Sequence, residues 1–214
     1  MLMSRDFHVQ EKAVARPSQP KLSTSAIAAA ALKLVDAHGD FTLPQLAKTL
    51  SVSASSLYNH VHGRDEIIEL MRGQAMSAIK LPEPREGAWQ ETVQAIAVEY
   101  WASYSKHPRL IPLMTSYTVR DSTTLRVYDA LAEAFAAAGF DPKQRLQAIT
   151  IVDSFVLGSA LDAAAPTEVW VADANISEAF RQALDSGQDQ VDRPVETFRL
   201  GLEIILDGLQ RTLL

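Results

Sequence analysis

The sequence contains no cysteine among its 214 residues. Disulfide scaffolds, thiolate nucleophiles and cysteine-ligated zinc sites are therefore excluded. Long apolar runs are also missing, and no segment is long enough to cross a bilayer as a helix. The first twenty residues contain Arg5, Asp6, Glu11, Lys12 and Arg16, and the apolar core of a signal peptide does not hold such charges. We therefore expect a cytoplasmic protein with no membrane partner.

Positive charge is scarce overall and gathers near the N-terminus. The chain has 20 basic and 26 acidic side chains, a net charge of −6. Residues 1–64 hold seven basic and four acidic side chains, a net +3, which leaves −9 for the remainder. A basic end on an acidic body suits a protein that holds phosphates at one end. The split is small and supports a nucleic-acid function only together with a motif.

Helix start and stop signals recur from Ser23 onward, and no segment shows the alternation of a strand. We expect an all-α fold with an arm at 1–22, a helix-turn-helix domain at 23–69 and a larger helical domain at 70–214. The predicted helices cover 24–38, two short segments after Thr42 and Ser53, 63–81, 87–106, 109–117, 122–138, 142–163, 175–186 and 194–213. Residues 163–175 are expected to form a loop or a lid.

The two short helices lie close together in the sequence. Thr42 and Gln45 form a capping box, and Ser53 is the N-cap of the next helix. Only Ser51, Val52 and Ser53 separate the two helices, so they must cross steeply over a small core. This spacing predicts a helix-turn-helix unit.

The second short helix carries side chains suited to reading DNA. Ser55 and Ser56 are small hydroxyl residues that let the backbone approach a groove, and Tyr58, Asn59 and His60 follow them. The alternative is that Leu57, Tyr58 and Val61 are core residues and the hydroxyls are only caps. We accept that alternative for Leu57 and Val61 and favour DNA binding for the polar residues.

The segment LAKTLSVSASSLYNHVHGRDEII strongly resembles the DNA-binding segment of the tetracycline-repressor (TetR) family of transcriptional regulators. The likeness also covers Trp89-Gln90, Ala138 to Phe140, Ser154 to Gly158 and Phe198 to Leu209. It implies a homodimeric repressor on a palindromic double-stranded DNA operator, released when a small-molecule effector enters the C-terminal domain.

By matching position, the resemblance assigns the DNA contacts to Thr42, Pro44, Gln45, Ser55, Ser56, Tyr58, Asn59, His60 and Arg64. Two positions depart from the family pattern. Ser51 stands where a turn glycine is common, which costs strain if φ is positive there. Leu43-Pro44 replaces the more usual Thr-x-Arg pattern and puts one phosphate or base contact in doubt.

Two apolar helices in the C-terminal half are candidates for the dimer interface. Gly201 and Gly208 lie near one side of the helix at 194–213, where small residues allow close packing. The helix at 142–163 is equally apolar, and the resemblance implies that both helices pair with their copies in a four-helix bundle. The alternative is that both helices belong to the core of one protomer.

The helix after Trp89 predicts one wall of a ligand cavity, because polar-tipped aromatics share its inner face. The alternative is an ordinary core whose tyrosines reach the surface. The tetracycline repressors place a histidine for the drug's magnesium within the segment that reads Leu113 to Thr115 here, and this chain has none. An apolar or aromatic effector is therefore expected. The candidate residues are Ile96, Tyr100, Tyr104, His107, Met114, Tyr117, Leu131, Phe135 and Phe155.

Catalysis has little support in the sequence. His60 and His62 are two residues apart and point to different sides of a helix, so they do not form a metal pair. No glycine-rich phosphate loop or nucleophile elbow is present. We expect no catalytic residue, metal or cofactor. A helix-turn-helix protein without a ligand switch is the alternative function, and a helical enzyme is a more remote one.

Overall fold

The computed structural model describes residues 22–83, 85, 87–187 and 192–213. Within these residues the chain forms ten helices and no strand, which confirms the all-α prediction. The expected arm at 1–22 lies outside the described residues except for Leu22.

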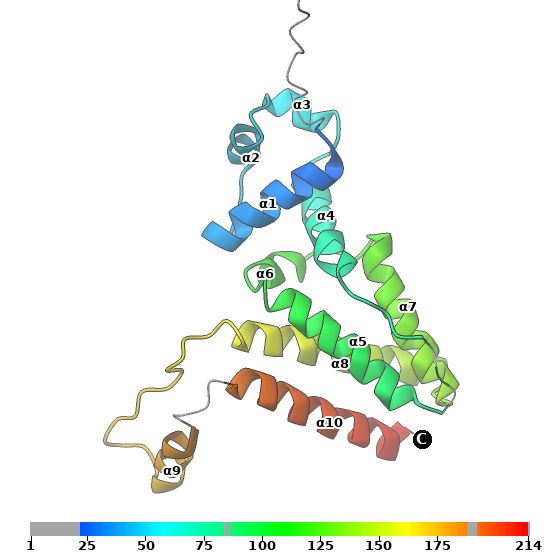
Figure 1. Cartoon of the computed structure of the whole chain (residues 1–214), viewed down its shortest axis with the longest axis vertical. Coiled ribbons are helices and arrows are strands. Elements are labelled where there is room, and N and C mark those ends of the chain that lie inside the picture. The colour runs from blue at the N-terminus through cyan, green and yellow to red at the C-terminus, as the bar shows by residue number, and fades with distance from the viewer. Residues whose placement is uncertain (1–21, 84, 86, 188–191, 214) are drawn as a thin grey trace, which may run out of the picture.

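The first three helices form a small unit at one end of the molecule (Figure 1): α1 is Thr24–His38, α2 is Leu43–Thr49 and α3 is Ala54–Tyr58. The predicted caps are confirmed. The Ser23 hydroxyl accepts from the Ala26 N–H at 3.2 Å, and Thr42 and Gln45 form the reciprocal capping box. Ser53 caps α3 by accepting from the Ser56 N–H at 3.2 Å. Local hydrogen bonds thus fix where these helices begin.

The turn between α2 and α3 passes through a left-handed residue. Ser51 has φ of 55°, the only positive φ at a non-glycine position among the described residues. A side chain at such a position costs about 1–2 kcal/mol, whereas glycine adopts the same conformation freely. The strain expected from the missing glycine is therefore present.

Replacing Ser51 with glycine is expected to stabilise the protein by up to about 1 kcal/mol, because the strain is removed while glycine loses more chain entropy on folding. Gly39 offers the reciprocal change, since it has φ of 80° and a Cβ there would meet no atom within 4 Å. Gly39→Ser should therefore lower stability by a similar amount. Urea unfolding of both variants measures this, and two shifts of the same sign would contradict it.

Helix α4, Arg64–Ser77, leads from this unit into the body of the molecule. Figure 1 shows that its first turns lie beside α1 and its last turns reach α7. The body contains α5 (Trp89–Tyr104), α6 (Leu110–Met114), α7 (Ser122–Ala137), α8 (Pro142–Asp162), α9 (Glu178–Gly187) and α10 (Arg193–Leu213). Helix α4 is thus the one element shared by the two parts.

Two predicted helices end three or four residues earlier than expected. Helix α4 stops at Ser77, not at residue 81, where the Ser103 hydroxyl donates to the Ala75 carbonyl at 2.7 Å and the Ser77 hydroxyl donates to the Gln74 carbonyl. Helix α6 stops at Met114, not at residue 117, because the buried Arg72 side chain donates to the carbonyls of Met114 and Tyr117. Side chains from distant elements satisfy the carbonyls of Ala75, Met114 and Tyr117, and local sequence does not reveal such partners.

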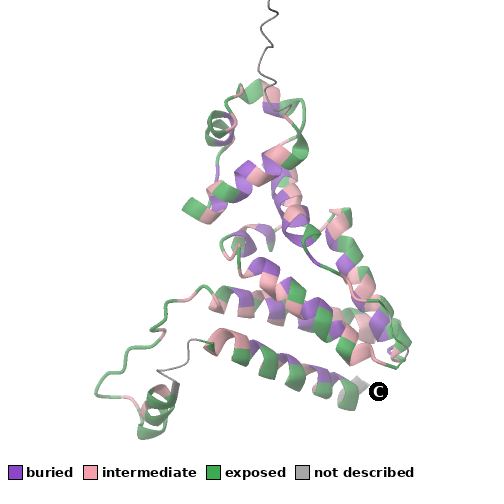
Figure 2. Cartoon of the chain, in the orientation of Figure 1, coloured by how far each residue is buried: buried purple, intermediate pink, exposed green. Residues whose placement is uncertain are grey.

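The core runs without interruption from the N-terminal unit into the body. It includes Ile27 of α1, Leu57 of α3, Ile68 of α4 and Leu209 of α10. Buried residues line the inner faces of α1, α4 and α5, whereas α2, α3 and the outer side of α10 are largely exposed (Figure 2). The surfaces left for partners are therefore at the α2–α3 end and along α8 and α10.

Residues 163–177, between α8 and α9, contain no helix, and most of them are exposed. This agrees with the predicted loop, and α9 begins at Glu178, three residues later than expected. The Trp170 ring meets Phe180 of α9 edge-on at 6.4 Å, and the Arg193 guanidinium lies 5.6 Å over the Trp170 ring. The loop is thus folded locally around one tryptophan.

Candidate functional site

Helix α3 presents polar side chains to solvent on an apolar anchor. Leu57 and Val61 are each only 1% exposed and fix the helix to the core, as predicted. Tyr58 is 55% exposed, and Asn59 and His60 are exposed beside it. A large aromatic side chain held on the surface of a five-residue helix contributes little to the core and is suited to an external contact.

The hydroxyl groups at the start of α3 are linked to one another. Ser53 Oγ lies 2.8 Å from both Ser55 Oγ and Ser56 Oγ. Ser55 is exposed and Ser56 is half-buried. On α2, Thr42, Pro44 and Gln45 are exposed at the first turn. The structure thus brings eight of the nine predicted DNA-contact residues to one end of the molecule with exposed or half-exposed side chains.

Arg64, the ninth, is also half-exposed, but other groups of the protein bind its guanidinium. Its guanidinium forms an ion pair with Asp40 at 2.5 Å, donates to the Phe41 carbonyl at 2.5 Å and lies 4.5 Å over the Phe41 ring. The hydrogen bond from Arg64, together with one from the Phe41 N–H, lowers the pKa of Asp40. Arg64 therefore ties the start of α4 to the connection between α1 and α2.

A polar cavity of about 160 Å³ lies between α4, α5, α6, α7 and α8, with the connection between α6 and α7 as part of its wall. Four predicted ligand residues line it, namely Tyr100, Tyr104, Met114 and Tyr117. The other six lining residues were not predicted, namely Arg72, Thr115, Val119, Tyr128, Asp153 and Leu157. Sequence features could have indicated two of the six. Arg72 interrupts the apolar face of α4, and Asp153 is the single charge within the apolar run from Ala148 to Ala160.

Asp153 is the centre of the polar wall. Its Oδ1 accepts hydrogen bonds from the Tyr100 hydroxyl at 2.7 Å and the Tyr128 hydroxyl at 2.8 Å. Burial raises the pKa of Tyr100 well above its ordinary value, and burial with the nearby Asp153 carboxylate also raises that of Tyr128. Both hydroxyls therefore remain protonated donors at neutral pH.

Tyr104 lies beside Tyr100, with ring centroids 5.2 Å apart. Its side chain is fully buried, burial raises its pKa, and its hydroxyl has no hydrogen-bond partner. A buried hydroxyl without a partner is costly, typically about 1–3 kcal/mol. The cavity therefore holds an unused polar group.

The other predicted ligand residues lie elsewhere. Ile96, Leu131 and Phe135 are buried in the core and do not line the cavity. His107 faces α1, where its Nδ1 lies 2.9 Å from Asp36 Oδ2. Phe155 stacks on Phe198 of α10 with ring centroids 5.7 Å apart. Only part of the predicted set therefore surrounds one space.

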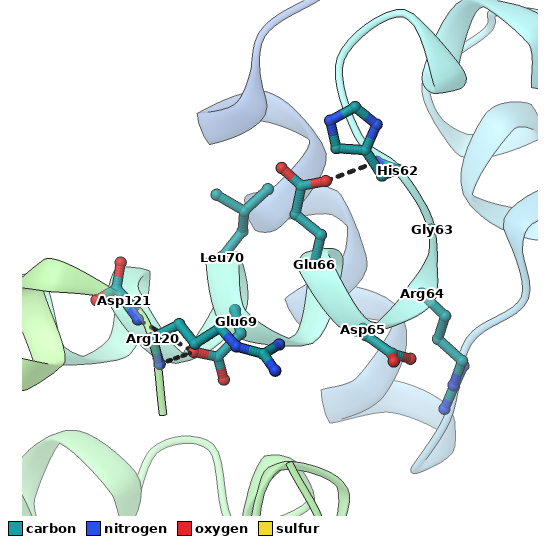
Figure 3. Close-up of a pocket in the computed structure, with 9 residues that line it drawn as sticks. All are labelled: His62, Gly63, Arg64, Asp65, Glu66, Glu69, Leu70, Arg120 and Asp121. Atoms are coloured by element: carbon teal, nitrogen blue, oxygen red, sulfur yellow. Dashed lines mark hydrogen bonds between the residues drawn. The ribbon is translucent and has the colours of Figure 1, made fainter. Parts of the chain in front are cut away.

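Two sets of contacts connect the cavity and the body to the N-terminal unit. Arg72 pairs with Glu69 at 2.6 Å on α4, and Glu69 Oε2 accepts from the backbone N–H groups of Arg120 and Asp121 at 2.7 and 3.1 Å. Figure 3 shows the Glu69 carboxylate turned toward the start of α7, in a surface pocket of about 600 Å³. A Cβ on Gly73 would lie 2.5 Å from the Asp121 side chain, so α4 and α7 pack tightly here.

The second set joins the connection between α5 and α6 to the end of α1. His107 pairs with Asp36, and Arg109 donates to the carbonyls of Asp36 and Ala37 at 3.2 and 2.6 Å. Cationic groups at a helix C-terminus are favoured by the helix dipole. Movement of either α4 or α6 would therefore be transmitted to the unit that carries α3.

An apolar groove runs along the outer side of α8 and α10. Its volume is about 980 Å³. Ile151 is 44% exposed and Ile204 59% exposed along these helices. Gly201 lets α10 approach α8 closely, since a Cβ there would lie 2.5 Å from Phe155. An apolar surface of this size on two antiparallel helices (Figure 1) indicates an interface. The groove residues are Leu146, Gln147, Thr150, Ile151, Ser154, Phe155, Ile205, Gly208 and Leu209.

Within the described part of the chain, no helix is long and apolar enough to cross a membrane. Among those same residues, no group of His, Asp and Glu side chains is arranged to hold a metal ion.

The family profile described as "Tetracyclin repressor-like, C-terminal domain" matches residues 81–213. The chain is 25% identical over 218 residues to the HTH-type transcriptional repressor DrrR1 of Streptomyces coeruleorubidus, covering 91% of this chain and 81% of that protein.

Solved structures share the fold. The TetR family protein ActR of Streptomyces coelicolor, in complex with (S)-DNPA, superposes with a TM-score of 0.73 at 22% identity, covering 91% of this chain and 100% of that one. BioQ with its double-stranded DNA operator superposes with a TM-score of 0.62 at 22% identity, covering 89% and 99%.

Proposed function

Because the chain belongs to the tetracycline-repressor (TetR) family of transcriptional regulators, we propose that it is a homodimeric repressor that a small molecule releases from its operator. The observation that carries this function is the exposed polar face of α3, anchored by Leu57 and Val61 and joined through α4 to a body with a polar cavity. No catalysis, cofactor or metal is needed for this function, and the cytoplasm is the compartment where the operator lies.

The DNA contacts are proposed for the exposed residues of α2 and α3. Tyr58, His60 and Thr42 are proposed to hold phosphates, while Ser55 and Asn59 reach base edges. Ser56, Pro44 and Gln45 complete the surface. Arg64 is proposed to act mainly by fixing the approach of α4 to this surface, because Asp40 and Phe41 already engage its guanidinium. In a dimer, two α3 helices about 34–36 Å apart fit successive major grooves.

Release is proposed to begin at the cavity. Its volume of about 160 Å³ is below the roughly 300–1,000 Å³ of typical ligand pockets. A larger ligand must therefore separate the walls, which include Met114 and Tyr117, whose carbonyls are bound by Arg72 of α4. The shift of α4 changes the spacing of the two α3 helices. The proposed domains are 23–69 for DNA and 70–214 for ligand and dimer contacts, with α4 crossing the boundary.

Footprinting on the DNA that flanks the protein's own gene tests the function. Protection of a palindromic site is expected, and loss of protection on adding cell extract identifies the ligand response. Protection that no extract or compound ever changes would favour the alternative of a helix-turn-helix protein without a switch. Absence of any protected site would contradict DNA regulation at this locus.

Tyr58→Ala is expected to weaken operator binding about tenfold or more, because the phosphate hydrogen bond and the ring contact are both lost. Binding to unrelated DNA should weaken in proportion, since phosphates carry no sequence information. Tyr58→Phe separates the two contributions and should cost only the hydroxyl, about three- to tenfold. Fluorescence anisotropy measures both, and unchanged affinity of Tyr58→Ala would remove Tyr58 from the contact set.

A further inference from the structure

We infer that the cavity binds a protonated amine carried on an apolar or aromatic body, with the ammonium group at Asp153. The inference rests on the proposed function in treating this cavity as the effector site. It goes further in naming the charge and the hydrogen-bonding character of the ligand.

The charges around the cavity leave one carboxylate without a cation. Arg72 is the only cationic side chain that lines the cavity within the described residues, and Glu69 pairs with it at 2.6 Å. No cationic side chain among those residues forms an ion pair with Asp153. The cavity wall with its Glu69 partner therefore has a net charge of −1, which a ligand cation neutralises.

The hydrogen bonds to Asp153 use up the donors of Tyr100 and Tyr128 and leave acceptors. Tyr100 and Tyr128 both donate their hydroxyl hydrogens to Asp153 Oδ1. Each of the two hydroxyl oxygens keeps lone pairs that can only accept, and Asp153 Oδ2 is a further acceptor. An ammonium group has three N–H donors and no acceptor, so it matches this wall.

The tyrosine rings add a second attraction for a cation. Tyr100 and Tyr104 meet edge to face, with an interplanar angle of 62°, so their rings face different directions around the cavity. A cation near the face of a tyrosine ring is attracted by its quadrupole, more strongly where water is excluded. The unpartnered Tyr104 hydroxyl, fully buried, offers the ammonium group one more acceptor.

The apolar part of the cavity lining suits a carbon skeleton. It consists of Met114, Val119 and Leu157. A methionine adapts its shape to aromatic groups and contacts them favourably through sulfur. An anionic ligand is disfavoured because the Asp153 carboxylate repels it. The expected ligand is therefore an amine in which a short linker joins the ammonium group to an apolar or aromatic group.

Isothermal titration calorimetry of the full chain, without DNA, tests the inference with three probes of one shape. These are 2-phenylethylamine, which is cationic at neutral pH, 2-phenylethanol, which is neutral, and phenylacetate, which is anionic. The amine is expected to bind at least about tenfold more tightly than the alcohol, and phenylacetate most weakly. Asp153→Asn should reduce the ratio of amine to alcohol affinity to about one.

Asp129→Asn is the matched control, because Asp129 is an exposed carboxylate on α7 next to Tyr128. It should keep the wild-type ratio. If Asp153→Asn does not fold, Tyr104→Phe and Tyr128→Phe test the inference instead. Each change removes one acceptor and should weaken binding of the amine severalfold more than binding of the alcohol.

Equal affinity for the amine and the alcohol, preference for phenylacetate, or no binding of the amine at millimolar concentrations would overturn the inference. None of these outcomes bears on operator binding, which footprinting measures separately. Conversely, a chain that protects no operator but prefers the amine would contradict the proposed function and leave the amine site in place.

Discussion

Replacing Ile151 with glutamate is expected to convert the dimer into monomers and to lower operator affinity by about 10²- to 10⁴-fold. The affinity falls because a dimer binds its second half-site at a high effective concentration, which a monomer lacks. Ile151 is 44% exposed and lies in the apolar groove along α8 and α10. In a symmetric interface along this groove, the change would bury two glutamates without partners, which is strongly unfavourable.

Leu125→Glu is the matched control for this change. Leu125 is 46% exposed on α7, away from the groove. Sedimentation equilibrium should show monomers for Ile151→Glu and dimers for Leu125→Glu, and anisotropy titrations give the two operator affinities. A dimer that withstands Ile151→Glu would place the interface on another surface.

Replacing Arg72 with methionine is expected to destabilise the protein by about 3–5 kcal/mol, the usual cost of breaking a buried ion pair from one side. The side chains of Arg72 and Glu69 are only 4% and 13% exposed. The change leaves the Glu69 carboxylate without its cation and frees the Met114 and Tyr117 carbonyls. Urea unfolding at a fixed protein concentration measures the loss, since dimer stability depends on concentration.

Adding Glu69→Gln to Arg72→Met separates the effect on stability from the effect on coupling between ligand and operator binding. The glutamine oxygen still accepts from the N–H groups of Arg120 and Asp121, and no buried charge remains. Most of the lost stability should return. The hydrogen bonds from Arg72 to the Met114 and Tyr117 carbonyls, which link the cavity to α4, stay lost. In the double variant, operator and ligand should therefore weaken each other's binding only slightly. In the wild type each must weaken the other by the same factor. Mutual weakening as strong as in the wild type would exclude Arg72 as the link.

Much of the fold could be predicted because its determinants are local. Ser23, Thr42 and Ser53 place the helix starts through hydrogen bonds within four residues, and Leu57 and Val61 mark the buried side of α3. The strain at Ser51 was also predictable, because a short turn between two helices requires a left-handed residue. These features depend on neighbours in the sequence.

The cavity was only partly predictable because its walls come from five helices and the connection between α6 and α7. His107 follows Tyr100 and Tyr104 at helical spacing, but α5 ends at Tyr104, so the chain turns and His107 meets Asp36 instead. Arg72 was missed because a charged residue on an apolar face is interpreted as solvated, whereas Glu69 and two distant carbonyls satisfy it here. Tertiary partners, which periodicity does not reveal, decided both positions.

Helix α8 lines both the cavity and the groove. One side carries Asp153 and Leu157 into the cavity, and the other side carries Ile151 and Ser154 into the groove. In a dimer joined along this groove, the two cavities would lie back to back, separated by the paired helices. A rotation of α8 that accommodates the first ligand would alter the second site before any ligand reaches it. Ligand titrations of this dimer therefore call for a scheme with two interacting sites, in which occupancy of one subunit sets the affinity of the other.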